Sequence, residues 1–86
     1  MRLSTLSPEA ATQNEMEQAI KAALPEAQVQ VTANQPGHFS IVVVSSEFAD
    51  KSKLACQRLV YRAISSLMSG PSAPVHAIDN LQTRIG

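Results

Sequence analysis

Two histidines and one cysteine are the residues of this chain best suited to bind a metal or act as nucleophiles. His76 stands in the stretch "APVHAIDNL", Ala73–Leu81, among small and apolar residues, and His38 follows a Pro-Gly pair. A neutral imidazole nitrogen is a good ligand for iron, zinc and copper. The spacing leaves two interpretations open for each histidine: it packs and hydrogen-bonds within its own fold, or it is presented to a partner.

The single cysteine, Cys56, lies on the apolar side of a helical pattern, which predicts a buried and unreactive thiol. It has no second cysteine with which to form a disulfide or a CxxC pair. The sequence also contains no nucleophile elbow, phosphate-binding P-loop or metal-hydrolase motif. These observations favour a chain that is not an enzyme.

The length of 86 residues, without an internal repeat, fits one domain spanning 1–86. One cysteine is typical of a reducing compartment. The longest aliphatic run, Ile41–Val44, is far too short to cross a bilayer, and no export signal is recognisable. We therefore expect a cytoplasmic protein without a membrane partner, in which about residues 1–8, which have no periodic pattern, are disordered.

Charge is distributed unevenly although the formal net charge is zero. Residues 1–50 carry two cations and six anions, a net charge of −4, whereas residues 51–86 carry five cations and one anion, a net charge of +4. A basic patch that suits an anionic partner is one interpretation, and two solvated faces are the other. The candidate cations are Lys51, Lys53, Arg58 and Arg62.

Apolar periodicity predicts a helix followed by a hairpin in the first half of the chain. Apolar residues repeat at helical spacing over Met16–Leu24 until Pro25, and capping signals at Ser7, Thr12 and Asn14 leave the start open. A period of two over Ala27–Ala33 predicts a half-buried edge strand. After a turn, the return strand His38–Ser45 is apolar on both faces, as expected of a strand with neighbours on each side.

The second half predicts a loop, a helix and a third strand. Phe48 is the one large apolar residue of the loop Ser45–Ser52, and Ser52 is a credible N-cap for a helix that stops at Ser69. Val75–Gln82 is expected to form a strand parallel to the preceding one, because a helix separates the two. The predicted fold is α+β, αββαβ, with a three-stranded mixed sheet, an antiparallel hairpin plus a parallel third strand, packed against two main helices.

Several ordered motifs resemble the BolA-like family, whose fold is similar to a class II KH domain. They lie in "GHFSIVVVSSEFADKSKLACQRLVYRAI": the His-Phe that opens a strand, the Val-Ser-Ser-x-Phe at its exit, the Lys-Ser before the helix and the Arg-Leu-Val-Tyr within it. "VHAI" then matches the family's His-Ala-Leu, and the resemblance extends from about Met16 to Leu81.

The resemblance implies a non-enzymatic adaptor that binds a monothiol glutaredoxin and shares a [2Fe-2S] cluster with it, in iron-sulfur trafficking or in iron or redox regulation. His76 fills the position of the family's signature cluster ligand, and His38 is the candidate for a second ligand or is only a strand-starting residue. The glutaredoxin cysteine and glutathione would supply the thiolates, so no cofactor is expected in the isolated chain.

Two other functions compete with this one. Some BolA-like proteins are proposed to be DNA-binding transcription regulators, which would use the basic second helix, although the Gly-x-x-Gly loop of true KH domains is absent. A scaffold that meets glutaredoxin without metal, or a weak homodimer, is also open. The chain departs from the family pattern in three places. It has Asp50 where family members often have glycine, and Cys-Gln-Arg at 56–58 where they often have Arg-His-Arg. It also lacks the Thr-Pro-x-x-Trp segment that often follows the last strand of family members.

Overall fold

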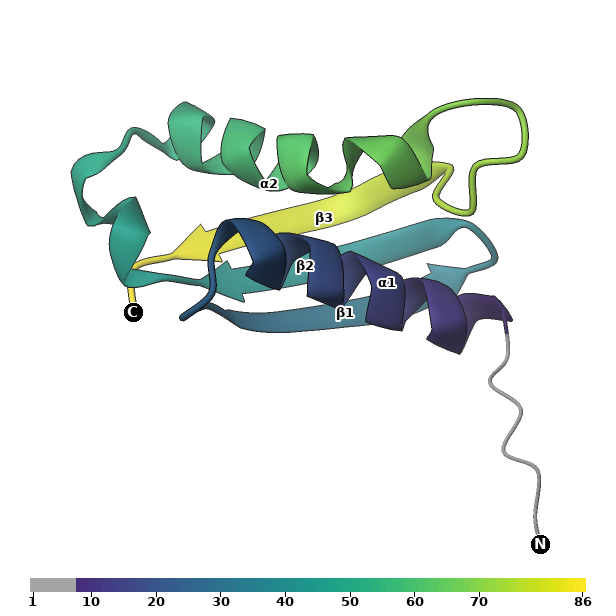
Figure 1. Cartoon of the computed structure of the whole chain (residues 1–86), viewed down its shortest axis with the longest axis horizontal. Coiled ribbons are helices and arrows are strands. Elements are labelled where there is room, and N and C mark those ends of the chain that lie inside the picture. The colour runs from purple at the N-terminus through teal and green to yellow at the C-terminus, as the bar shows by residue number, and fades with distance from the viewer. Residues whose placement is uncertain (1–7) are drawn as a thin grey trace, which may run out of the picture.

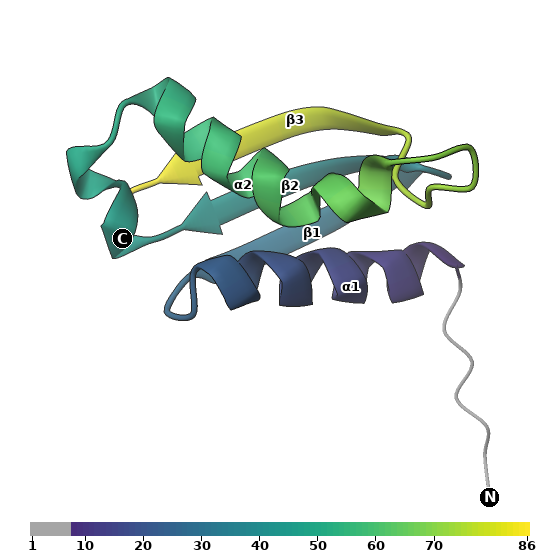
Figure 2. The same ribbon diagram turned by 45° about the horizontal axis from the view of Figure 1, so that its top comes forward.

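Two helices cover one face of a three-stranded sheet and leave its other face open (Figures 1 and 2). The computed structural model of the chain describes residues 8–86. The predicted αββαβ order is confirmed. The elements are α1 (Pro8–Ala23), β1 (Gln28–Gln35), β2 (His38–Val44), the short 3-10 helix η1 (Ser46–Asp50), α2 (Lys53–Met68) and β3 (Ala77–Arg84).

Helix α1 begins at Pro8, the outermost of the starts that the sequence left open. Proline suits a first helical position because its fixed φ is already helical and its missing N–H would have no partner there. Thr12 lies inside the helix, where its hydroxyl donates to the Pro8 carbonyl at 2.9 Å, so a start at Thr12 or Asn14 is wrong. The predicted Ser7 cap and the predicted disorder of residues 1–7 lie outside the described residues, but Pro8 is helical.

The sheet has the order β1-β2-β3, with β2 antiparallel to β1 and parallel to β3, as predicted. Residues along β2 alternate between a half-buried and a fully buried environment. Phe39, Ile41 and Val43 therefore face the helices, whereas His38 and Ser40 lie on the open face. This alternation fixes the face on which each polar side chain of β2 lies.

The third strand is offset from its predicted position. It was expected over Val75–Gln82 but spans Ala77–Arg84. Val75 is buried at the end of the α2–β3 connection, where its N–H donates to the Leu67 carbonyl at 3.1 Å. Its apolar side chain therefore belongs to the core without belonging to the strand, which apolar periodicity cannot distinguish.

The predicted loop after β2 contains the short helix η1. The Ser45 hydroxyl accepts from the Glu47 N–H at 3.1 Å and so caps this helix. Phe48, the one large apolar residue of this segment, is buried, with 2% of its surface exposed. Ser52 caps α2 as predicted, since its hydroxyl accepts from the Ala55 N–H at 3.1 Å.

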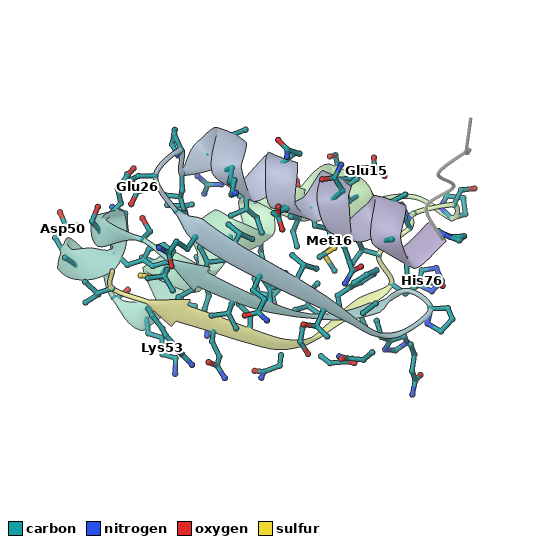
Figure 3. The ribbon with its side chains drawn as sticks, turned by 90° about the horizontal axis from the view of Figure 1, so that it is seen from below. Glu15, Met16, Glu26, Asp50, Lys53 and His76 are labelled. Carbon is teal, nitrogen blue, oxygen red and sulfur yellow. The ribbon has the colours of Figure 1, made fainter. Side chains whose placement is uncertain are left out.

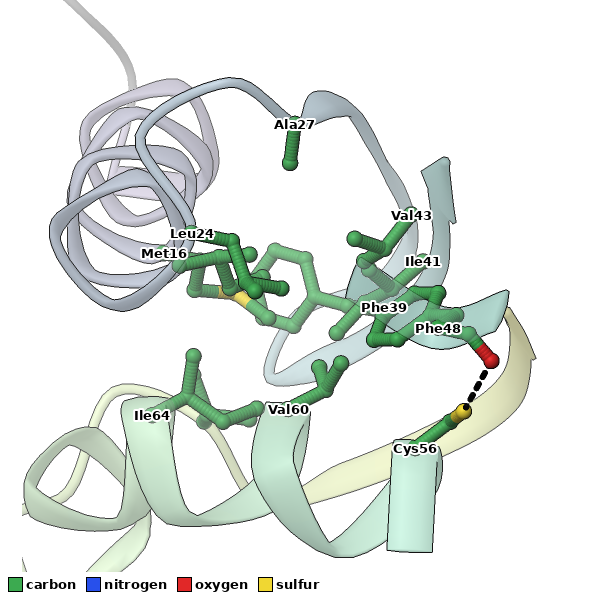
Figure 4. Packing of buried hydrophobic residues seen from close by; sticks show 12 residues of the cluster. Met16, Leu24, Ala27, Phe39, Ile41, Val43, Phe48, Cys56, Val60 and Ile64 are labelled. Carbon is green, nitrogen blue, oxygen red and sulfur yellow. Dashed lines mark hydrogen bonds between the residues drawn. The ribbon is translucent and has the colours of Figure 1, made fainter. Parts of the chain in front are cut away.

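The core fills the space between the two helices and the covered face of the sheet (Figure 4). Cys56 is buried as predicted, and its thiol donates a long contact of 3.9 Å to the Phe48 carbonyl. Ala23, on the predicted apolar stripe of α1, is exposed instead. The buried apolar residues are Met16, Ile20, Leu24, Ala27, Phe39, Ile41, Val43, Phe48, Cys56, Val60, Ile64 and Val75.

Candidate functional site

His76 lies immediately before β3, next to the turn between β1 and β2. The N–H groups of His76 and Ala77 both donate to the Gly37 carbonyl, at 2.8 and 3.0 Å, which fixes the backbone of the histidine. The residue is exposed, and neither ring nitrogen makes a hydrogen bond to any of residues 8–86. The imidazole thus has a defined attachment and two nitrogens that the described fold does not use.

A hollow of about 180 Å³ opens beside the His76 ring. It lies at the end of the molecule where the β1–β2 turn approaches the first turn of α1 (Figure 3). Three prolines restrict backbone motion around it, because each fixes its own φ. Its lining residues are Pro8, Glu9, Thr12, Pro36, Gly37, Phe39, Pro74 and His76.

His38 is held on the open face of the sheet by Asp79. His38 Nδ1 lies 3.1 Å from Asp79 Oδ1, and the two side chains are 39% and 41% exposed. The Asn34 amide donates to the other carboxylate oxygen at 3.0 Å and to the Ser40 hydroxyl at 2.8 Å. Hydrogen bonds from Asn34 and then His38 lower the pKa of Asp79. Because an ionised carboxylate can only accept a hydrogen bond, the tautomer of His38 that fits this contact has its N–H at Nδ1. The lone pair of the neutral ring is then on Nε2.

Asp79 reaches this face because of an irregularity in β3. Ile78 pairs with Phe39 and Asn80 pairs with Ser40, which leaves Asp79 as an extra residue between two ladder positions. Such a bulge redirects a side chain. Asp79 and Asn80 are consequently both exposed, whereas Ile78 packs against the core.

The structure places the two predicted ligands at the same end of the sheet but in different surroundings. His38 is in register with Ala77, the residue after His76. His76 shares its hollow with the core residue Phe39, whereas His38 makes its contacts on the opposite face. Within residues 8–86, no group of three or more histidine, cysteine or acidic side chains could hold a metal ion.

The predicted basic patch divides between two hollows along α2. Lys51, Arg58 and Arg62 line a groove of about 300 Å³ together with Leu54 and Leu59. Lys53 lines a second hollow next to Thr83 and Ile85, at the C-terminal end of β3, and Lys51 is common to the two hollows. Figure 3 shows Lys53 and His76 at opposite ends of the molecule, so this cation does not belong to the His76 site.

Sequence reasoning did not identify the residues that hold the two histidines. Asp79 and Asn34 lie 41 and 45 positions from their partners along the chain, so no local pattern reports them. The Pro-Gly pair before His38 predicts a turn, but it does not predict that Gly37 contacts His76. The only feature of the sequence that could have indicated this contact is the glycine before His38, and the need for a glycine in the turn already explains its presence.

Known proteins confirm the family that the motifs indicated. The family model described as BolA-like protein matches residues 12–84. No curated protein sequence gives a significant match. Within residues 8–86, no helix has the length and apolar content needed to cross a bilayer.

Three solved structures illustrate the similarity. A bol-like protein from Babesia bovis is 26% identical with a TM-score of 0.71, over 98% of this chain and 90% of that one. BolA1 from Mus musculus is 27% identical with a TM-score of 0.70, and the match covers 99% of this chain and 74% of that one. A BolA protein from Ehrlichia chaffeensis is 34% identical with a TM-score of 0.51, over 87% and 92%. Because the family model covers nearly the whole described chain, this protein belongs to the BolA-like family.

Proposed function

We propose that this chain is a non-enzymatic adaptor that binds a monothiol glutaredoxin and shares a [2Fe-2S] cluster with it, with His76 as its principal ligand. One observation carries the proposal: the His76 imidazole is exposed on a fixed backbone, and residues 8–86 use neither of its nitrogens. A histidine buried in the fold would be expected to hydrogen-bond within it, whereas this exposed imidazole is open to a partner.

The ligand chemistry agrees with this role. Imidazole is a good ligand for iron, and histidine in place of thiolate makes a cluster less negative and raises its reduction potential. Two histidines supply at most two of the four ligands that such a cluster takes, so a partner has to provide the remainder. This requirement fits a shared cluster and a partner with thiolates.

His38 is the candidate for a second ligand, through Nε2. Its Nδ1 faces the Asp79 carboxylate at 3.1 Å, which is the arrangement that commonly orients metal-binding histidines. The same contact also joins β2 to β3, so a purely structural role is the alternative. Separate substitutions of the two histidines distinguish these roles.

The test is to mix the chain with a cluster-loaded monothiol glutaredoxin and to record visible absorption and circular dichroism. We expect the wild-type chain to produce a new spectrum that His76→Ala abolishes. His38→Ala, a matched loss of an imidazole, should alter the spectrum without abolishing it if His38 is the second ligand. An unchanged spectrum in His38→Ala assigns that residue to the fold, and an unchanged spectrum in His76→Ala refutes the proposal.

DNA binding is the second candidate function, supported by the groove that Lys51, Arg58 and Arg62 line. Lys51 Nζ lies 3.6 Å from Asp50 Oδ1, whereas Arg58 and Arg62 form no ion pair with residues 8–86. Contacts to phosphates release counterions, so binding of a short DNA duplex should weaken steeply as salt rises. Neutralising Arg58 and Arg62 together should then reduce the slope by about two. Flat salt dependence, or unchanged binding by the double variant, counts against this function.

A further inference from the structure

We propose that Gly37 is the positioning residue for His76, and that the turn it forms leaves Nε2 as the ring nitrogen offered to a ligand. The inference rests on the proposed function, since it concerns how the same imidazole is presented. It adds a residue from a different element to the site and specifies the donor atom.

The β1–β2 turn holds the backbone of His76 in place. Gly37 has φ of +79°, a conformation that residues with a side chain rarely adopt. Its carbonyl accepts both the His76 and the Ala77 N–H, so the turn and the start of β3 are held together. The backbone of His76 is therefore placed by one peptide group of a distant turn.

The absence of a side chain at Gly37 makes room for the imidazole. A Cβ at this position would lie 2.7 Å from His76 Nδ1 and 2.8 Å from Cγ, well inside van der Waals contact. The ring thus occupies the space that any other residue would fill. A side chain at position 37 has to displace the ring that we propose as the ligand.

The same contact distinguishes the two ring nitrogens. The Nδ1–Cγ side of the ring faces Gly37, and Nε2 is not among the three atoms nearest to the added Cβ. The turn therefore shields Nδ1, and Nε2, which lies farther from Gly37, is the nitrogen left for a ligand. His38 independently has its Nδ1 side occupied by Asp79, so both candidate ligands present Nε2.

The chain supplies a matched control for this inference. Gly70 also has a positive φ, +88°, yet a Cβ there meets no atom within 4 Å. Gly37→Ala and Gly70→Ala therefore impose a similar backbone strain on a turn, and only the first adds a collision with His76. The difference between the two variants isolates the positioning effect.

The first measurement uses the isolated chain and no cluster. Nuclear Overhauser contacts between the Gly37 α-protons and the His76 ring, with the ring ¹⁵N shifts, report the position of the imidazole. We expect Gly37→Ala to change the His76 signals and Gly70→Ala to leave them as in the wild type, while amide spectra show both variants folded. Equal effects of the two variants on the His76 ring overturn the positioning role, whether or not a cluster is ever bound.

The second measurement concerns the donor atom and uses the mixed complex with a cluster-loaded glutaredoxin. Histidine labelled with ¹⁵N at Nε2 or at Nδ1 should give the larger hyperfine coupling for Nε2, and Gly37→Ala should weaken the complex roughly tenfold or more relative to Gly70→Ala. A larger coupling at Nδ1, or equal affinities for the two variants, refutes this inference alone. No histidine coupling at either nitrogen refutes the proposed function instead.

Discussion

His38 and His76 differ in what holds each imidazole. A side chain holds His38, because Asp79 accepts from its ring at 3.1 Å and is itself held by Asn34. Backbone holds His76, because Gly37 accepts its N–H and leaves space for its ring. No side chain of residues 8–86 hydrogen-bonds to the His76 ring, so its Nε2 is free of such a contact, and this difference makes His76 the stronger candidate ligand.

Glu26 is the acidic residue with the most hydrogen bonds in the described fold, and it leads to a prediction on pH. Its carboxylate accepts from the Ser45 hydroxyl at 2.9 Å and from the N–H and hydroxyl of Ser46 at 3.0 Å each. The hydrogen bond from Ser45, followed by those from Ser46, lowers the pKa of Glu26. A carboxyl whose pKa is lower in the folded state stabilises the fold most above its unfolded pKa, and this contribution is lost as pH falls through the folded pKa.

Glu26→Gln should therefore lower the urea midpoint at pH 7, and the difference from the wild type should shrink as the solution is acidified through the carboxyl range. Glu15→Gln provides the control, because Glu15 is exposed on α1 and forms no ion pair with another described residue. Urea unfolding at several pH values measures both. If the urea midpoint of Glu26→Gln stays below that of the wild type by the same amount down to pH 2, the charge of Glu26 is not the cause of the stabilisation.

At the scale of elements, β1 is an edge strand without a charged residue or a proline. Such an edge invites pairing with another chain unless it is covered. One carbonyl of β1, that of Val31, has a partner in α1, because the side-chain amide of Gln13 donates to it at 2.9 Å. The helix thus contributes a polar contact to the sheet in addition to its apolar face.

Gln13→Ala should lower the free energy of unfolding by about 0.5–1.5 kcal/mol, because it removes one neutral hydrogen bond. Gln18→Ala makes the same change on the same helix at an exposed position without a hydrogen bond to the described residues, and should have little effect. Urea unfolding quantifies both, and amide exchange along β1 reports local opening. Equal effects of the two variants would assign the loss to helix propensity or solvation.

The elements themselves were largely predictable because each has a local signal. Apolar periodicity located both helices, alternation located the hairpin, and Ser52 marked the start of α2. The position of β3 and the helix η1 were not predicted, because tertiary contacts decide them. Val75 is apolar but buried outside the strand, and Ser45 and Glu26 meet across 19 positions of the chain.

The candidate site was predictable only in part, for the same reason. The family motif indicated His76 and His38, but Gly37 and Asp79 act through contacts between distant segments. Charge counting correctly indicated cations in the second half of the chain. It could not show that Lys53 lies apart from the groove formed by Arg58 and Arg62.

At the scale of the whole molecule, the His76 hollow and the basic groove along α2 have no lining residue in common. We expect the two surfaces to act independently. Arg58→Gln combined with Arg62→Gln should weaken binding to DNA, or to any other polyanion, and leave the visible circular dichroism of the cluster complex unchanged. His76→Ala should abolish the visible circular dichroism of the cluster complex and leave binding to DNA unchanged. A double variant that loses the cluster spectrum as fully as His76→Ala would show that the surfaces cooperate.

The most direct test of the account is nitrogen hyperfine spectroscopy of the reduced mixed cluster, formed from this chain with ¹⁵N-labelled histidine and an unlabelled glutaredoxin. The account predicts a directly bound ¹⁵N in the wild-type complex, and the loss of a strongly coupled nitrogen in His76→Ala. A wild-type cluster without ¹⁵N coupling, or the same coupling after His76→Ala, would contradict it.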